Sequence, residues 1–140
     1  MLDATLIRVR PVAALIVGAT GRHVLRIVSA FEGRRIITIR AEDVAEACER
    51  MALEMPHVVL VLVPPRDASE REALAERAVA VGALVVHVDP RLDEETFQHL
   101  LDRTVQAALE RKIRREEAEI QLRASGASDI PEALDDGWDG

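Results

Sequence analysis

The sequence predicts an α/β protein of three layers, in which helices cover both faces of a doubly wound parallel sheet. Runs of Val, Ile and Leu alternate along the chain with segments of helical periodicity, and only short turns separate them. The runs are continuously apolar, which is typical of strands buried on both faces. Four such runs with right-handed crossovers lead us to expect strand order 2-1-3-4, with the two most apolar strands in the centre.

The first predicted strand covers residues 12–17, and the turn Gly18-Ala19-Thr20-Gly21 follows it directly. A helix is then predicted from Arg22 to Phe31, with Gly33 as its left-handed C-terminal cap. The turn lies at the carboxyl end of a central strand, where open α/β sheets place their ligand sites. We therefore expect any small-molecule or phosphoryl chemistry of this protein to lie there.

The remaining elements continue the alternation. The sequence predicts strands over 34–40, 57–63 and 84–88, and helices over 42–53 and 69–81. Ser69 is the expected N-cap of the second of these helices, because Glu72 follows it at the spacing of a capping box. The last helix is predicted to begin near Asp93 and to extend as far as Arg123.

The last helix divides into an apolar part and a charged part, which suggests the domain boundaries. Large apolar residues recur at helical spacing over 97–109, whereas Ile113, Ile120 and Leu122 are the sizeable apolar residues beyond it. We assign 1–109 to the α/β domain, 110–124 to a charged helical extension and 125–140 to a disordered acidic tail. The extension is expected to project into solvent, or to pair in a homodimer through Leu109, Ile113 and Ile120.

Composition limits the possible partners and location. The net charge is −7, and residues 125–140 carry five acids and no base, so we expect no nucleic-acid partner. Cys48 is the single cysteine, which excludes an internal disulfide and suits a small buried side chain. The N-terminus does not read as a signal peptide, and no apolar run has the length of a membrane span. We expect a cytoplasmic protein without a membrane partner.

Three segments, LIVGA, EDVAEACERMALEMPHVVLVLVPP and AVGALVVHVDP, resemble response-regulator receiver domains. The resemblance covers about residues 14–108 and implies a flavodoxin-like α/β domain that accepts a phosphoryl group on an aspartate. The family's Mg²⁺-binding acidic pair corresponds here to Gly18 and Ala19, its phosphoacceptor to Leu62 or a close neighbour, and its lysine to Asp89. The chain is also one β-α unit short.

These replacements have a chemical meaning. Phosphoryl transfer to aspartate needs a nucleophilic carboxylate, a metal held by oxygen ligands and a cation for the developing charge. The matching positions supply none of the three. The resemblance therefore implies a degenerate pseudo-receiver, which is not an enzyme, uses no cofactor and signals through contacts with partner proteins.

The turn Gly18-Ala19-Thr20-Gly21 supports an alternative, because it resembles the GATG start of NAD(P)-binding Rossmann domains. Arg40, at the end of the second strand, would then suit a 2′-phosphate. The third glycine of the fingerprint falls at Val24, inside the helix, and four strands leave no second mononucleotide-binding half. The alternative is a small nucleotide-binding or NAD(P)-binding protein that uses this turn.

Loop acids and histidines are the remaining candidates for a metal site. Asp67, Asp89 and Asp93 follow the third and fourth strands, so they would meet at the carboxyl edge of the sheet if they acted together. The histidines, which are His23, His57, His87 and His99, lack the spacing of metal ligands. We interpret the acids as caps and turn residues and the histidines as capping, packing or surface residues, and we expect no metal.

The acidic tail carries three apolar residues, Ile130, Leu134 and Trp138, of which the last is the chain's single tryptophan. Their spacing of four residues would align them on one face of a helix. We expect them to anchor a segment that becomes ordered on an apolar groove rimmed by Lys or Arg. Two alternatives are an acidic tail that only aids solubility and a tail that folds back on the basic residues of 111–115.

Overall fold

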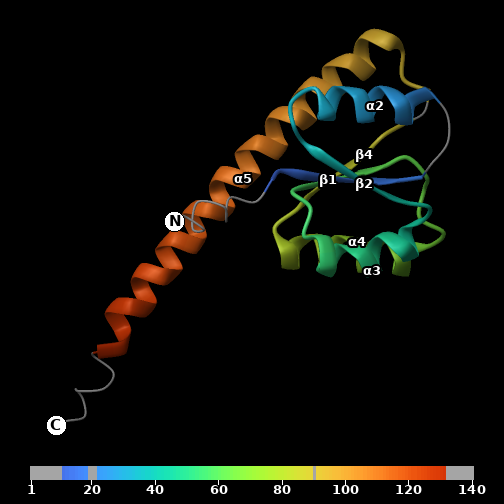
Figure 1. Ribbon diagram of the computed structural model, residues 1–140. Helices are drawn as coiled ribbons and strands as arrows, with labels where there is room; N and C mark the ends of the chain where they lie inside the picture. The colour runs from blue at the N-terminus through green and yellow to red at the C-terminus, as the bar shows by residue number, and fades with distance from the viewer. Residues whose placement is uncertain (1–10, 19–21, 90, 132–140) are drawn as a thin grey trace.

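A four-stranded parallel sheet with strand order β2-β1-β3-β4 forms the middle of the molecule (Figure 1). The computed structural model describes residues 11–18, 22–89 and 91–131, and side chains as far as residue 124. The strands are β1 (Ala13–Val17), β2 (Ile37–Ala41), β3 (Val58–Val61) and β4 (Leu84–His87). β1 pairs with both β2 and β3, so that Ala14 lies between Thr38 and Val58. The predicted class and strand order are confirmed.

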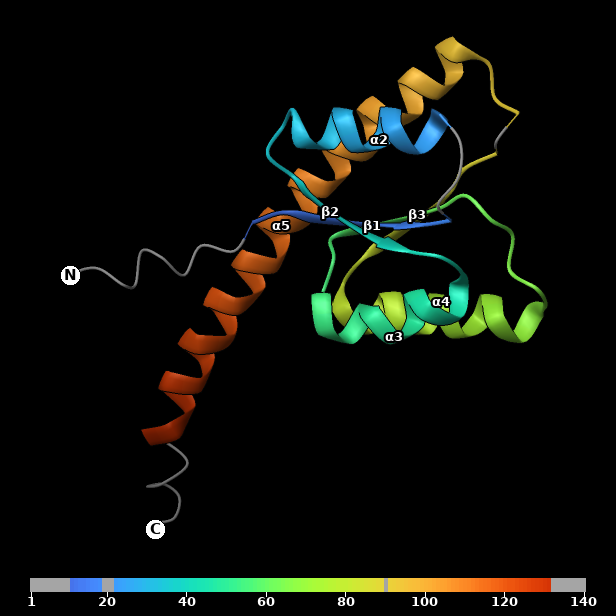
Figure 2. The same ribbon diagram turned by 45° about the vertical axis from the view of Figure 1, so that its right-hand side comes forward.

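Two helices cover each face of the sheet, as Figures 1 and 2 show. The helices α2 (Arg22–Glu32) and α5 (Glu94–Pro131) lie on one face, and α3 (Val44–Glu54) and α4 (Ala68–Val81) lie on the other. Because successive strand residues point to opposite faces, β1 and β3 supply both cores. Ala14, Ile16, Val58 and Leu60 pack with Phe31 and Phe97, whereas Leu15, Val17, Val59 and Val61 pack with Met51 and Leu74.

Two predicted helix ends are wrong. Gly33 does not adopt a left-handed conformation; Arg35 does, with a φ of 62°. The Ile36 N–H donates to the Phe31 carbonyl at 2.9 Å, so the chain turns two residues later than expected and closes α2 with a Schellman-type bond. At the start of α4 the N-cap is Asp67 rather than Ser69.

The helix α5 is longer than its predicted end at Arg123, and it continues to Pro131. Its first part packs on the sheet through Phe97, Leu101, Val105 and Ala108, in agreement with the predicted apolar face. Its later part extends away from the sheet and the other helices (Figures 1 and 2). Among the described residues, no helix combines the length and apolar character that a membrane span requires.

The proximal end of the charged extension is docked on the domain instead of projecting into solvent. Arg115 donates to the Met55 carbonyl at 2.8 Å and to the Pro56 and Val81 carbonyls at 2.9 Å each. Arg111 donates to the Gly82 carbonyl at 3.3 Å. These carbonyls lie at the C-terminal ends of α3 and α4, where unpaired carbonyl groups concentrate partial negative charge. The part of the extension that projects away from the domain therefore begins after Glu116.

Candidate functional site

The carboxyl edge of the sheet brings together the residues that follow β1, β3 and β4. The Gly18 N–H donates to the Ala41 carbonyl at 2.8 Å, and the Leu62 N–H donates to the Val17 carbonyl at 2.9 Å. The Val88 N–H continues the ladder to the Val61 carbonyl at 2.9 Å. Backbone pairing thus extends past the strand ends and holds the starts of these loops side by side.

Gly18 lies directly against the end of β3. Its φ is +100°, and a Cβ atom at this position would lie 2.9 Å from Val63 Cγ1 and 3.5 Å from Leu62 Cβ. Both the backbone conformation and the contact with Val63 therefore require a glycine here. This packing accounts for Gly18 without any ligand.

The rest of the predicted nucleotide turn, Ala19, Thr20 and Gly21, lies outside the described residues. Arg40 lies exposed on β2, where its register partner is Ile16. The structure thus shows a packing role for Gly18, the first residue of the turn. Binding of a nucleotide or NAD(P) at this turn stays a prediction.

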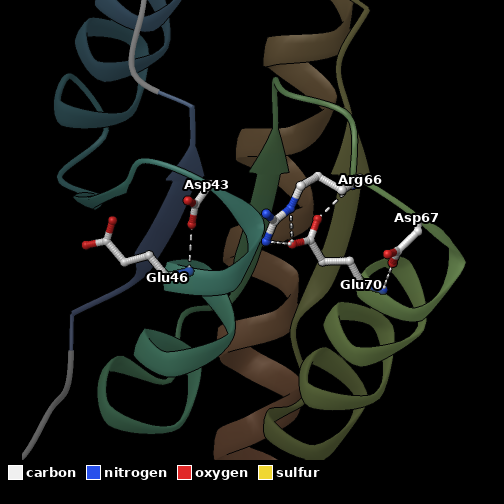
Figure 3. Close-up of polar contacts among 5 residues, drawn as sticks. All are labelled: Asp43, Glu46, Arg66, Asp67 and Glu70. Atoms are coloured by element: carbon white, nitrogen blue, oxygen red, sulfur yellow. Dashed lines mark hydrogen bonds and ion pairs between the residues drawn. The ribbon is translucent and has the colours of Figure 1, made fainter.

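Aspartates at this edge cap the helices that leave it. Asp43 accepts a hydrogen bond from the Glu46 N–H at 2.9 Å, and Asp67 accepts one from the Glu70 N–H at the same distance (Figure 3). Glu70 in turn accepts from the backbone N–H of Arg66 at 2.7 Å and from its guanidinium. The sequence pattern D-x-x-E therefore forms the same cap at α3 and at α4, in which the aspartate accepts from the glutamate N–H and the glutamate accepts from the N–H of the residue before the aspartate, Glu42 at 2.8 Å in α3 and Arg66 in α4.

The two acids that follow β4 are also engaged locally. Asp89 accepts from the Arg91 N–H at 2.9 Å, and this bond, with the nearby Arg91 charge, lowers the pKa of the Asp89 carboxyl. Asp93 accepts from the Thr96 N–H at 2.7 Å, which likewise lowers its pKa. Within the part of the chain that the structure describes, no three His, Cys, Asp or Glu residues are placed to hold a metal ion.

A cleft of about 650 Å³ opens between the loops that follow β3 and β4. Its lining is mostly apolar and comprises Val61, Leu62, Val63, Pro64, Pro65 and Val88, with His87 and Asp89. Arg71 from α4 and Arg91 from the β4–α5 loop complete it. Sequence reasoning missed this cleft, because Arg71 and Arg91 are twenty residues apart in ordinary charged segments. Arg91 is paired with the Asp89 carboxylate at 3.5 Å, so the two arginines exceed the acids of the lining by one positive charge. An apolar floor with this net positive charge favours a small anion with an apolar body.

The four histidines occupy four different environments. His23 packs edge-on against the Phe97 ring at 4.5 Å between centroids, and His87 lines the cleft. His99 is exposed on α5. His57 is 4% exposed, and its Nδ1 accepts a hydrogen bond from the Ala13 N–H at 3.1 Å. Only His57 is a buried titratable group among these, and it lies at the amino edge of the sheet, away from the cleft.

Burial holds the pKa of His57 at about 4, and the neighbouring Arg115 contributes to the lowering. The other charged groups that act on it, Lys112 and Glu116, also belong to α5. The unfolded chain binds a proton near pH 6.5, so between pH 6.5 and 4 it binds more protons than the folded protein. The stabilisation is complete above pH 6.5 and is lost as the pH falls toward 4.

We expect this effect to remove up to about 3 kcal/mol of unfolding free energy. Urea unfolding at pH 7.0 and 4.5 measures it, with His57→Gln as the variant and His99→Gln as the exposed control. The wild type and His99→Gln should lose clearly more stability on acidification than His57→Gln does. An equal loss in all three proteins would show that His57 does not titrate as its burial requires.

Two of the three predicted partner-binding residues lie beyond the described part of the chain. These are Leu134 and Trp138, whereas Ile130 belongs to the last turn of the α5 backbone. A scan against protein-family models finds no match for this chain, and a search of curated protein sequences finds none either. The receiver resemblance therefore stays a prediction from the quoted segments.

Proposed function

We propose that this chain is a non-enzymatic, receiver-like regulatory module that is not phosphorylated on aspartate and acts through protein–protein contacts. The observation that supports this proposal most directly is the packing of Gly18 against Val63. Where a receiver domain would gather its acidic pair and phosphoacceptor, the ends of β1 and β3 present a glycine and apolar side chains in van der Waals contact. The nearby acids, Asp43 and Asp67, are engaged as helix caps.

The distal part of α5 is the element that we propose for contacts with other proteins. Ile113 is 54% exposed, Ile120 is 63% exposed, and Leu122 is exposed as well. Large aliphatic side chains on a charged helix that leaves its domain are typical of an interaction surface rather than of a folded core. This surface includes the proposed homodimer contact, and the tail with Ile130, Leu134 and Trp138 is the second proposed contact segment.

The proposal predicts that the protein takes no phosphoryl group from a small phosphodonor. After incubation with acetyl phosphate and Mg²⁺, intact-mass measurement should show only the unmodified chain, because the described residues of this edge include no group of acids placed to hold a metal ion, and Asp43 and Asp67 are engaged as helix caps. A stoichiometric adduct that is lost in mild base, as an acyl phosphate is, would overturn the proposal. A receiver domain treated in parallel confirms that the donor is active.

The cleft favours a second candidate function, the binding of a small anionic ligand such as a nucleotide. Arg71 and Arg91 would hold the anion, and Val61, Leu62 and Pro65 would contact the apolar part. A nucleotide bound in this way would lie between the loops that follow β3 and β4. It does not depend on the turn after β1.

Isothermal titration with NADP and ATP distinguishes the two candidates. Under the main proposal we expect no binding tighter than about 1 mM. A micromolar dissociation constant that is lost in Arg71→Ala and kept in the control Arg103→Ala would favour the ligand-binding function. Arg103 is exposed on α5, outside the lining of the cleft. Gly18→Val is unsuitable here, because it disturbs the contact with Val63 whether or not a ligand binds.

A further inference from the structure

His57 lies at the junction between the amino edge of the sheet and α5. It directly precedes β3 and is almost fully buried. Its backbone N–H donates to the Ala13 carbonyl at 2.8 Å, and its own carbonyl accepts from the Leu84 N–H at 3.0 Å. Its Nδ1 accepts from the Ala13 N–H at 3.1 Å. The residue therefore joins the first residues of β1 and β4, and its imidazole contributes only while Nδ1 carries no proton.

The docked turn of α5, residues 111–116, lies against the same junction. Within it, Arg115 donates to the carbonyl of Pro56, the residue before His57, at 2.9 Å. Its other two bonds go to carbonyls at the ends of α3 and α4. These three bonds keep the guanidinium near the imidazole, and among the charged groups Arg115 has the largest effect on His57.

The charged groups that act on His57 belong to the docked turn. Arg115 and Lys112 disfavour a proton on the imidazole, and Glu116 favours one. Because Glu116 is paired with Lys112 at 2.6 Å, the three groups sum to one positive charge. On the other elements, β1 and the last turn of α4 carry no charged residue, and Glu54 of α3 is paired within its own helix. A proton on His57 would therefore double the positive charge at this junction.

We infer that protonation of His57 releases the docked turn, so that the junction acts as an acid-sensitive latch on α5. The imidazolium cannot accept from the Ala13 N–H, so this bond is lost. It also repels the Arg115 guanidinium, which lies close by in a buried setting where charges are poorly screened. Once Arg115 leaves its carbonyls, α5 beyond Leu109, where its packing on the core ends, is free to move relative to the sheet.

The pH dependence of the latch has a definite sign. In the docked state the pKa of His57 is about 4, whereas an imidazole released from burial and from Arg115 titrates nearer 6.5. The released state therefore binds more protons, and acid favours it. Between pH 7.0 and 4.5 the ratio of released to docked protein should rise by up to about 60-fold. Linkage is reciprocal, so a partner that holds α5 in the released position would raise the pKa of His57.

The separation of two spin labels, one on α3 and one on α5, tests the latch. In a Cys48→Ala background, Leu53→Cys and Ala118→Cys provide exposed attachment points, and double electron–electron resonance measures the distance from pH 7.0 to 4.0. We expect a single narrow distance at pH 7.0 and a second population that grows as NMR shows His57 taking up its proton. His57→Gln should keep the narrow distance throughout, and the exposed control His99→Gln should behave like the wild type.

The Met51 methyl resonance shows in the same samples whether the domain stays folded, because Met51 is buried in the core that α3 and α4 cover. A single narrow distance after His57 has become protonated would overturn the inference, as would equal release in His57→Gln. Release that coincides with loss of the native Met51 signal would also overturn it, because the domain would then unfold as one unit.

The wild-type protein decides the question if His57→Gln does not fold. Release must then accompany protonation of His57 while the Met51 signal stays native. These outcomes are independent of the phosphodonor test and of the interaction role proposed for α5, so the latch and the proposed function can fail separately.

Discussion

Replacing Leu60 with aspartate is expected to leave the protein largely unfolded at 25 °C. Leu60 is fully buried in β3, a central strand, and belongs to the core that α2 and α5 cover. An unpaired carboxylate in this aliphatic core costs several kcal/mol, whether it stays charged or takes up a proton. A domain of this size has a total stability of about 5–15 kcal/mol, so the change removes most of it.

The same chemical change on the surface provides the control. Leu53 is 82% exposed on α3, and Leu53→Asp should alter the free energy of unfolding by less than about 0.5 kcal/mol. Val61→Asp tests the opposite face of β3 and should be as damaging as Leu60→Asp. Circular dichroism during urea unfolding measures all three variants. A Leu60→Asp protein with a wild-type midpoint would contradict the central position of β3.

The layers of this fold were predictable because they depend on patterns that are local in the sequence. The run HVVLVLV contains β3, and its continuous apolar character already indicates burial on both faces. Helix ends were less predictable, because several residues nearby had the right chemistry. Ser69 was the expected N-cap of α4, but Asp67 takes this position, because it accepts from the Glu70 N–H while the Arg66 N–H donates to the Glu70 carboxylate.

The candidate site was less predictable, because it depends on which loops the sheet brings together. The contact of Gly18 with Val63 joins positions forty-five residues apart, and the sequence offers Gly18 equally well as part of a nucleotide-binding turn. The docking of Arg115 was missed for the same reason. In the sequence it is one of several basic residues in a charged helix, and nothing local distinguishes it from its exposed neighbour Arg114.

Arg115→Ala is expected to lower the stability of the protein strongly, because Arg115 is docked on the domain whereas Arg114 is exposed. Three carbonyls at the ends of α3 and α4 accept hydrogen bonds from this one guanidinium. Hydrogen bonds from a charged donor contribute about 1.5–3 kcal/mol each and are not additive, so we expect a loss of about 2–4 kcal/mol. Arg114→Ala, which removes the same side chain from the exposed side of the helix, should cost less than about 0.5 kcal/mol.

Two further measurements separate the docking role of Arg115 from a general effect of its charge. Arg115→Lys keeps the charge but replaces a planar fork of donors with a single ammonium group, so it should recover only part of the lost stability. Because the Arg115 charge contributes to the low pKa of His57, its removal should also raise that pKa toward 6.5, which NMR titration of the imidazole detects. If Arg115→Ala unfolds at the wild-type urea concentration and leaves the His57 titration unchanged, Arg115 does not hold α5 on the domain.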